Sequence, residues 1–181
     1  MNIQDYVSIY NAIDKLTCKQ IVDEFVNSNW EKHSYNDPIT KENKTYDDDL
    51  DVAYQTTYTQ YLNEKIKLCL TDYIKNVANT QFGIQDFSDI RFNKYEVGTN
   101  MKFHYDHIHT LFDGERKGIP ILTILALLND DFEGGDFLMF DSKKVELEAG
   151  DIIIFPSNFL YPHAVNTVTK GTRYSFVSWA W

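Results

Sequence analysis

Apolar residues follow two different rhythms along this chain of 181 residues, and the change falls near residue 80. In the first part they recur at intervals of three and four, the spacing that puts side chains on one face of an α-helix. This spacing predicts one helix that begins at about Leu16 and a second helix over about residues 56–78. In the second part, short segments rich in β-branched and aromatic residues stand between turn residues, which is typical of strands.

The start of the first helix is predicted from the residues around Thr17. Thr17 with Gln20 three positions later has the form of a capping box, in which each side chain bonds the free backbone N–H of the other residue. Leu16 and Ile21 stand at the spacing of a hydrophobic staple, which fixes the direction from which the chain enters the helix. The apolar stripe that follows indicates packing in a core.

Eight strand segments are predicted in the second part of the chain. They cover residues 90–95, 101–108, 119–128, 137–140, 144–147, 152–155, 163–168 and 172–181. Many short strands with regular turns predict a mostly β fold with N-terminal helices, here a double-stranded β-helix (jelly roll, cupin-like) with helices packed on one side. We expect one compact domain, with a helical support region over residues 1–85 and the jelly-roll core over residues 86–181.

A polar stretch over residues 31–51 ends in the acidic run of residues 47–51. A run of like charges is typical of a solvated loop, and we interpret this one so, with a cation site as the alternative. Such a loop could act as a mobile flap that meets a substrate.

Composition and charge narrow the class of protein. The hydrophobic fraction of 43% is enough for a core, and the net charge of −10 argues against nucleic-acid binding, which needs clustered Lys and Arg. No apolar run reaches the length of about 20 residues that spans a bilayer, and no secretory signal is visible. Cys18 and Cys69 fall within the helical patterns, so we interpret them as small buried hydrophobic residues in a reducing compartment and not as a disulfide. We expect a soluble cytoplasmic protein without a membrane partner.

Candidate chemistry is concentrated in residues 102–109, which hold three of the five histidines. Side chains two apart in a strand lie on the same face, so His104 and Asp106 are expected side by side. The other face then carries apolar Met101, Phe103 and Tyr105. A histidine and a carboxylate in this arrangement supply two of the three ligands of the facial triad that holds non-haem Fe(II).

The two remaining histidines of this stretch are odd-numbered. His107 and His109 therefore share the face of Tyr105 and point away from His104 and Asp106. We interpret both as loop or supporting residues, close to where a substrate could be met.

The third ligand must come from elsewhere in the chain. His33 lies in the polar N-terminal region, so His163, which opens a predicted strand, is the better candidate. Ten residues later stands Arg173, on the same face of its strand as Trp179. The planar fork of an arginine is suited to a carboxylate, so an inward-pointing Arg173 indicates an anionic cosubstrate. The alternative is a surface arginine on an edge strand.

Four stretches, taken in order, resemble the prolyl 4-hydroxylase-like branch of the Fe(II)- and 2-oxoglutarate-dependent dioxygenases. They are Tyr95-x-x-Gly98-x-x-Met101-x-x-His104-x-Asp106, residues 123–129 (TILALLN), residues 133–136 (EGGD), and Gly150-Asp151-(x)4-Pro156 through His163, Arg173 and Trp179. The resemblance covers about residues 90–181, roughly half of the chain. His-x-Asp alone is weak evidence, but its combination with a distal histidine and a basic residue ten positions later is specific.

The resemblance implies a role for each matching residue. His104, Asp106 and His163 match the iron ligands of the family, and Arg173 matches the basic residue that pairs with the distal carboxylate of 2-oxoglutarate. This branch more often has lysine there, whereas arginine is common in the wider superfamily. Tyr95 and Thr123 match positions that help to hold the same carboxylate, while the residues themselves are equally compatible with a core tyrosine and a strand filler.

The resemblance further implies hydroxylation of an unactivated C–H bond, with a prolyl residue of a peptide or protein as the expected substrate and succinate and CO2 as products. Fe(II), 2-oxoglutarate and O2 are the implied cofactors and cosubstrates, and ascorbate is a further candidate. Recognition of the substrate would fall to residues 31–51 and 107–118. Alternatives are a free amino acid or another substrate, a non-enzymatic jelly-roll module that binds a metal or ligand, and a cupin-like enzyme without a keto acid, which leaves Arg173 unexplained.

Overall fold

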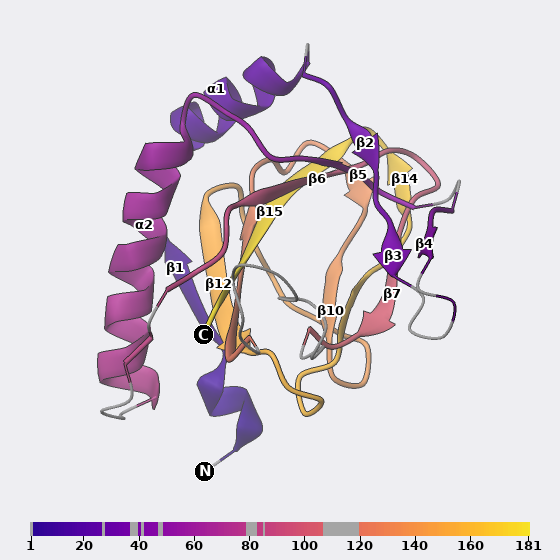
Figure 1. Cartoon of the computed structure of the whole chain (residues 1–181). Coiled ribbons are helices and arrows are strands. Elements are labelled where there is room, and N and C mark those ends of the chain that lie inside the picture. Colours follow the sequence, from indigo (N-terminus) through magenta and orange to yellow (C-terminus); the bar gives the residue numbers. More distant parts are fainter. Residues whose placement is uncertain are drawn as a thin grey trace.

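Two antiparallel sheets packed face to face form the body of the protein (Figure 1). The computed structural model describes residues 2–26, 28–36, 40, 42–46, 49–78, 83–84, 86–106 and 120–181. The larger sheet consists, in spatial order, of β1 (Ser8–Asn11), β12 (Asp151–Pro156), β8 (Leu122–Leu127), β15 (Arg173–Ala180), β6 (Arg91–Tyr95), β5 (Asp51–Ala53) and β2 (Glu31–Lys32). The smaller sheet consists of β11 (Lys143–Lys144), β10 (Phe137–Met139), β13 (His163–Val165) and β7 (Met101–His104).

The remaining elements are short pairs of strands and the helices. The strand pairs are β14 (Val168–Lys170) with β9 (Glu133–Gly134), and β3 (Tyr35–Asn36) with β4 (Asn43–Lys44). The helices are η1 (Ile3–Tyr6), α1 (Lys15–Phe25), α2 (Thr59–Asp72) and the π-helix η2 (Tyr73–Ala78). None of the described helices is both long and apolar enough to cross a bilayer. The prediction of a mostly β fold is confirmed, and strands from the first half of the chain extend the larger sheet at both edges.

The larger sheet separates two hydrophobic cores. On its outer face, α1 and α2 cover the strands (Figure 1), and residues such as Phe25, Leu62 and Phe176 pack together there. On its inner face, residues such as Leu125 and Phe155 pack against the smaller sheet. Every residue of β8 is buried, because successive side chains enter one core and then the other. The strand predicted over residues 119–128 is therefore a central strand, and both of its faces are buried.

The cap of α1 differs from the predicted one. Asp14 precedes the helix, and its Oδ1 accepts a hydrogen bond of 2.8 Å from the backbone N–H of Thr17, while its Oδ2 accepts one of 2.7 Å from the Thr17 hydroxyl. The predicted capping box of Thr17 and Gln20 is therefore wrong, and so is the staple, since Leu16 is 67% exposed. A carboxylate is a favourable acceptor at the positive end of the helix dipole, which explains why Asp14 takes the position.

The second predicted helix is confirmed, with a change of form near its end. The α-helical part is α2, and the π-helix η2 continues it as far as Ala78. Tyr73, at this transition, is buried, and its hydroxyl donates a hydrogen bond of 2.7 Å to the carbonyl oxygen of Tyr6. Cys18 and Cys69 are free thiols buried in the outer core, as predicted.

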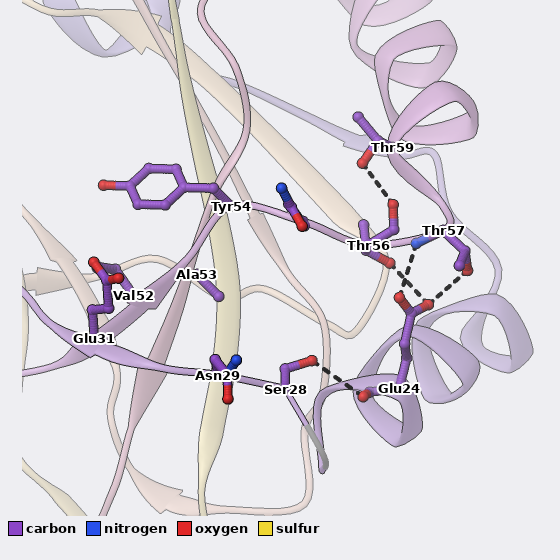
Figure 2. A pocket seen from close by; sticks show the side chains of 11 residues that line it. Glu24, Ser28, Asn29, Glu31, Val52, Ala53, Tyr54, Thr56, Thr57 and Thr59 are labelled. Atoms are coloured by element: carbon purple, nitrogen blue, oxygen red, sulfur yellow. Dashed lines mark hydrogen bonds between the residues drawn. The ribbon is translucent and has the colours of Figure 1, made fainter.

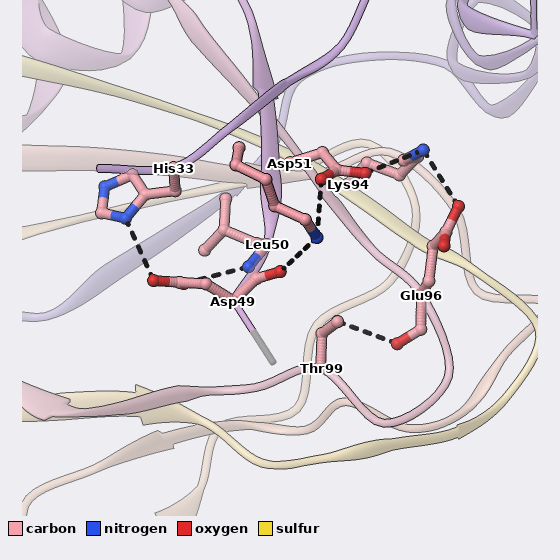
Figure 3. A network of polar contacts seen from close by, with 8 residues as sticks. His33, Asp49, Leu50, Asp51, Lys94, Glu96 and Thr99 are labelled. Atoms are coloured by element: carbon pink, nitrogen blue, oxygen red, sulfur yellow. Dashed lines mark hydrogen bonds and ion pairs between the residues drawn. The ribbon is translucent and has the colours of Figure 1, made fainter. Parts of the chain in front are cut away.

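The described part of the acidic run, residues 49–51, is not a solvated loop. Asp51 belongs to β5, which pairs with β6, and its carboxylate lies 2.9 Å from Lys32 Nζ and 3.0 Å from Lys94 Nζ (Figure 3). Asp49 and Leu50 are buried. These lysines come from neighbouring strands and supply the cationic partners that allow this part of the acidic run to join the sheet. Residues 47–48 of that run lie outside the described residues.

Candidate active site

Three predicted ligands meet at the edge of the smaller sheet. Strand pairing sets His163 of β13 directly opposite His104 of β7, and Asp106 follows two residues after the end of β7. Nε2 of His104 lies 3.5 Å from Asp106 Oδ1, and Nε2 of His163 lies 3.7 Å from Asp106 Oδ2. One ligand atom from each residue lies within 4.8 Å of the other two, so a single cation could be held by all three.

Backbone carbonyls fix the orientation of both imidazole rings. Nδ1 of His104 lies 2.8 Å from the carbonyl oxygen of Lys102, and Nδ1 of His163 lies 3.1 Å from that of Tyr161. Because a carbonyl oxygen can only accept, Nδ1 must carry the proton in each ring. The Nε2 atoms are left to face Asp106, which is the arrangement that metal-binding histidines need.

The electrostatics of the three residues centre on the carboxylate. Burial by itself would raise the pKa of Asp106, but its hydrogen-bonding contact with His104 and its electrostatic interactions with His163 and His104 outweigh burial and hold that pKa well below its usual range. Burial lowers the pKa of His104, yet the hydrogen bond and charge of Asp106 raise it above its ordinary value overall. For His163, burial dominates and the pKa is lowered. Asp106 is thus an ionised carboxylate between two imidazoles, a donor set that favours a divalent cation.

Buried hydroxyl groups hold the Asp106 carboxylate in place. The Thr123 hydroxyl donates a hydrogen bond of 2.8 Å to Asp106 Oδ2. Since its single proton is used there, the Ser157 hydroxyl, 2.9 Å away, must donate to Thr123. Trp179 pairs in register with Thr123. Its indole N–H forms no hydrogen bond with the described residues, but it lies close enough to Asp106 to lower the pKa of that carboxylate further.

Arg173 is buried inside the larger sheet and has unused hydrogen-bonding capacity. Its side chain is 1% exposed, its Nη1 donates to the Ser175 hydroxyl at 2.8 Å, and its guanidinium lies 5.1 Å from the ring centroid of Tyr95. Among the described residues Nε has no hydrogen-bond partner and the guanidinium has no ion pair. The alternative of a surface arginine on an edge strand is therefore wrong. A buried cation left in this state is suited to an anionic ligand.

Comparison with known families identifies the class of protein. Residues 90–181 match the family model of the 2OG-Fe(II) oxygenase superfamily. The chain belongs to this superfamily. Fe(II), 2-oxoglutarate and O2 are the cofactors and cosubstrates of the family, and the two imidazoles and one carboxylate of this site fit Fe(II). The orphaned Nε of Arg173 fits one carboxylate of 2-oxoglutarate.

Individual relatives agree with this assignment. A PKHD-type hydroxylase of Acinetobacter baumannii is 33% identical over 94 residues, which make up 49% of this chain and 40% of the relative. The chain therefore spans less than half the length of this relative. Among solved structures, a prolyl hydroxylase of Trichoplax adhaerens in complex with a peptide of hypoxia inducible factor has a TM-score of 0.72 at 16% identity, over 98% of this chain and 84% of that one. A prolyl-4-hydroxylase of Pseudomonas putida has a TM-score of 0.67 at 17% identity, over 96% and 91%. This likeness confirms the jelly-roll prediction.

The strand that carries His104 departs from its predicted form, because it is shorter and most of its expected apolar face is exposed. Alternation correctly puts His104 and Asp106 together, but the strand ends at His104. Only Met101 of the expected apolar face is buried, because β7 ends the smaller sheet, and Phe103 and Tyr105 are 45% and 47% exposed. The other two histidines of the stretch, at positions 107 and 109, lie outside the described residues.

The structure brings a group of residues beside the oxygenase site that the sequence did not indicate. His33, set aside as part of a polar region, is 9% exposed, and its Nε2 lies 3.0 Å from Nη1 of Arg91. Its Nδ1 lies 3.7 Å from the carboxylate of Asp49 (Figure 3). Arg91 in turn lies over the ring of Trp179. Alternation from Tyr95 along β6 is the signal that could have identified Arg91 as inward-pointing, whereas nothing local indicated His33.

A separate cavity of about 880 Å³ lies away from these residues, between the end of α1 and the segment that leads into α2 (Figure 2). Figure 2 shows the carboxylate of Glu24 pointing at Thr56 and Thr57, with which it forms hydrogen bonds of 2.7 to 3.1 Å. These bonds tie α1 to the start of α2. None of the predicted site residues lines this cavity.

Proposed function

We propose that this protein is an Fe(II)- and 2-oxoglutarate-dependent dioxygenase that hydroxylates an unactivated C–H bond, with a prolyl residue of a peptide or protein as its substrate. The observation that carries the proposal is the meeting of His104, Asp106 and His163 within 4.8 Å, in a fold whose inner wall also holds the buried Arg173. The relatives described above, a PKHD-type hydroxylase and two prolyl hydroxylases, support the substrate class.

In this proposal each residue of the site has a physical task. His104 and His163 bind Fe(II) through Nε2, and Asp106 binds it through its carboxylate. The iron, together with O2 and 2-oxoglutarate, supplies the oxidation that inserts one oxygen atom into the substrate C–H bond and leaves succinate and CO2. The bonds from Nδ1 of both histidines to backbone carbonyls and the bond from Thr123 to Asp106 hold the three ligands in position before the metal arrives.

The cosubstrate end of the site is formed by Arg173 and Tyr95. Arg173 grips the distal carboxylate of 2-oxoglutarate, and the Tyr95 ring, 3% exposed, lies against the guanidinium. Thr123 has been matched with the same carboxylate, but its observed bond to Asp106 supports a task at the metal as well. The apolar inner core around these residues excludes water from the reacting groups. Residues 86–181 contain the residues of this site, and residues 1–85 support that part of the fold. Ascorbate serves as a reductant that keeps the iron as Fe(II).

The proposal is tested by succinate release with Fe(II) and 2-oxoglutarate across a panel of proline-containing peptides, followed by mass spectrometry for one added oxygen atom. We expect His104→Ala and Asp106→Ala to reduce metal-dependent succinate formation to background. Tyr105→Ala is the matched control, because this side chain lies between the two ligands in sequence and is 47% exposed. Undiminished turnover of 2-oxoglutarate by the two ligand variants would contradict the assignment.

A further inference from the structure

A second arginine, Arg91, lies on the inner face of the larger sheet, which we call the inner wall. It stands at the opposite end of β6 from the proposed cosubstrate site. Arg91 is the first residue of β6 and Tyr95 is the last, and the four residue steps from one to the other correspond to about 13 Å along the strand. Tyr95 pairs in register with Arg173, whereas Arg91 pairs with Val177, two residues from Trp179. Arg91 and Arg173 therefore lie at different positions on the inner wall.

Arg91 borders the candidate metal site through Trp179. The centre of its guanidinium lies 5.1 Å from the centroid of the Trp179 ring. Trp179 pairs in register with Thr123, which bonds Asp106. The charge of Arg91 also reaches His104, whose pKa it lowers in part. A substrate that approaches the three ligands from this side would meet Arg91.

The hydrogen bonds of Arg91 fix its guanidinium without neutralising it. Nε donates to the Asn93 side-chain oxygen at 3.1 Å, and Nη1 donates to Nε2 of His33 at 3.0 Å. Both acceptors are uncharged. Among the residues that the structure describes, Nη2 has no hydrogen-bond partner and the guanidinium makes no ion pair, although it is half-buried.

His33 remains neutral in this arrangement. An arginine can only donate, so Nε2 of His33 accepts and the imidazole proton stays on Nδ1, which faces Asp49 at 3.7 Å. Burial, followed by the charge of Arg91, lowers the pKa of His33 to about 4, against the raising effect of Asp49. Asp49 is thus held at the other side of the imidazole ring from Arg91, and the guanidinium keeps its full charge toward the site.

A half-buried cation without an anionic partner is costly, and proteins keep such groups mainly where a ligand completes them. Arg173 is the comparable case in this chain, since it also lacks an ion pair among the described residues and is proposed to take a carboxylate. We propose that Arg91 binds a carboxylate of the substrate, so that the enzyme selects substrates that carry a carboxylate near the hydroxylated carbon. This inference rests on the proposed function and names its substrate class.

The carboxylate could be an acidic side chain next to the target proline, the C-terminal carboxylate of a peptide that ends in proline, or that of a free amino acid. Each source has an amide counterpart of almost the same shape: Asn or Gln, a C-terminal amide, and the amino-acid amide. Comparison of kcat/KM within each acid and amide pair identifies the source. Charge-assisted hydrogen bonds predict that the parent enzyme prefers the acid of one pair by about 10- to 100-fold.

Three variants connect this preference with Arg91. We expect Arg91→Gln to remove the preference for the acid, and Arg91→Lys to keep part of it, because lysine retains the charge and loses the planar fork. Lys94→Gln is the matched control: it removes one positive charge from the same strand, three residues after Arg91, where the side chain pairs with Asp51 and Glu96 on the opposite face of the sheet. It should keep the full preference. Affinity for Mn(II) and 2-oxoglutarate, measured by calorimetry, should survive in Arg91→Gln.

Binding measured without turnover separates this inference from the proposed function. The acid and amide probes are titrated anaerobically into the Mn(II) and 2-oxoglutarate form of the parent and of each variant. If acid-selective binding depends on Arg91 but no substrate yields succinate, the proposed function fails and this inference stands. If acid and amide bind and react alike in the parent, or if Arg91→Gln and Arg91→Lys leave the selectivity of the parent unchanged, the inference is overturned and Arg91 only packs on Trp179. If Arg91→Gln does not fold, comparison of the acid and amide selectivity of the parent and of Arg91→Lys still tests the inference.

Discussion

Thr123 offers a test of how the protein prepares Asp106 for a metal. Thr123→Val keeps the shape of the side chain and removes the hydroxyl that donates to Asp106 Oδ2 at 2.8 Å and accepts from Ser157 at 2.9 Å. Thr123 is 0% exposed and Ser157 is 1% exposed, so water cannot easily replace the lost partners. A hydrogen bond to a charged group contributes about 1.5–3 kcal/mol, which corresponds to a loss of about 10- to 100-fold in metal affinity.

The assay is a titration of the variant with Mn(II) or Fe(II) under anaerobic conditions, with 2-oxoglutarate binding measured separately. If Thr123 acts through Asp106, Thr123→Val weakens metal binding, and the affinity of the metal-loaded protein for 2-oxoglutarate changes little. Thr123→Ser, which keeps a hydroxyl, should restore most of the metal affinity. An unchanged metal affinity together with weaker 2-oxoglutarate binding would refute this reasoning and favour the task that the family resemblance implied, contact with the cosubstrate carboxylate.

Two further predictions follow from backbone conformation and from burial. Gly135 has φ +63°, and an added Cβ would lie 3.1 Å from Arg173 Cδ and 3.0 Å from Val168 Cγ2, so Gly135→Ala should displace Arg173. We expect a higher KM for 2-oxoglutarate and a loss of about 1–3 kcal/mol of stability, measured by thermal unfolding; an unchanged KM would contradict this. The pKa of His33 is about 4 in the folded protein, so between that value and the unfolded value of about 6.5 the unfolded state binds more protons and stability rises with pH. Urea unfolding should show about 2 kcal/mol less stability at pH 5 than at pH 7 from this residue, and His33→Asn should flatten that part of the profile; an equal slope in the variant would show that other groups cause it.

The sequence predicted those parts of the fold that depend on the pattern of apolar and polar residues within a short segment. Alternation predicted β6, and a run of apolar residues predicted β8. The spacing from His104 through His163 to Arg173 predicted the candidate site. Each of these signals depends on residues close in sequence or on a fixed order of motifs. The residues at which helices and strands begin and end were harder to predict. Asp14 took the cap from Thr17 because two acceptable caps stood three residues apart, and a carboxylate is a strong acceptor at that place.

Other features depend on partners that are distant in the chain. The acidic residue Asp51 was interpreted as solvated because Lys32 and Lys94 become its partners only when β2, β5 and β6 assemble. His33 and Arg91 are likewise 58 residues apart in sequence and meet only through the sheet. Periodicity says which face a side chain occupies but not what faces it, so such pairs need the assembled structure.

The pairing of His104 with His163 gives the metal a mechanical role. These two residues are more than fifty positions apart in the chain, on neighbouring strands, and β13 is the only strand that pairs with β7 in the part of the chain that the structure describes. An ion bound to both histidines is a cross-link between β7 and β13, comparable in position to a disulfide that ties a border strand to the sheet. Its removal would open a long loop and leave β7 held by its backbone pairing with β13 and by the packing of Met101 in the inner core. In the proposed function, the metal that takes part in the oxidation would therefore also fasten β7 to the smaller sheet.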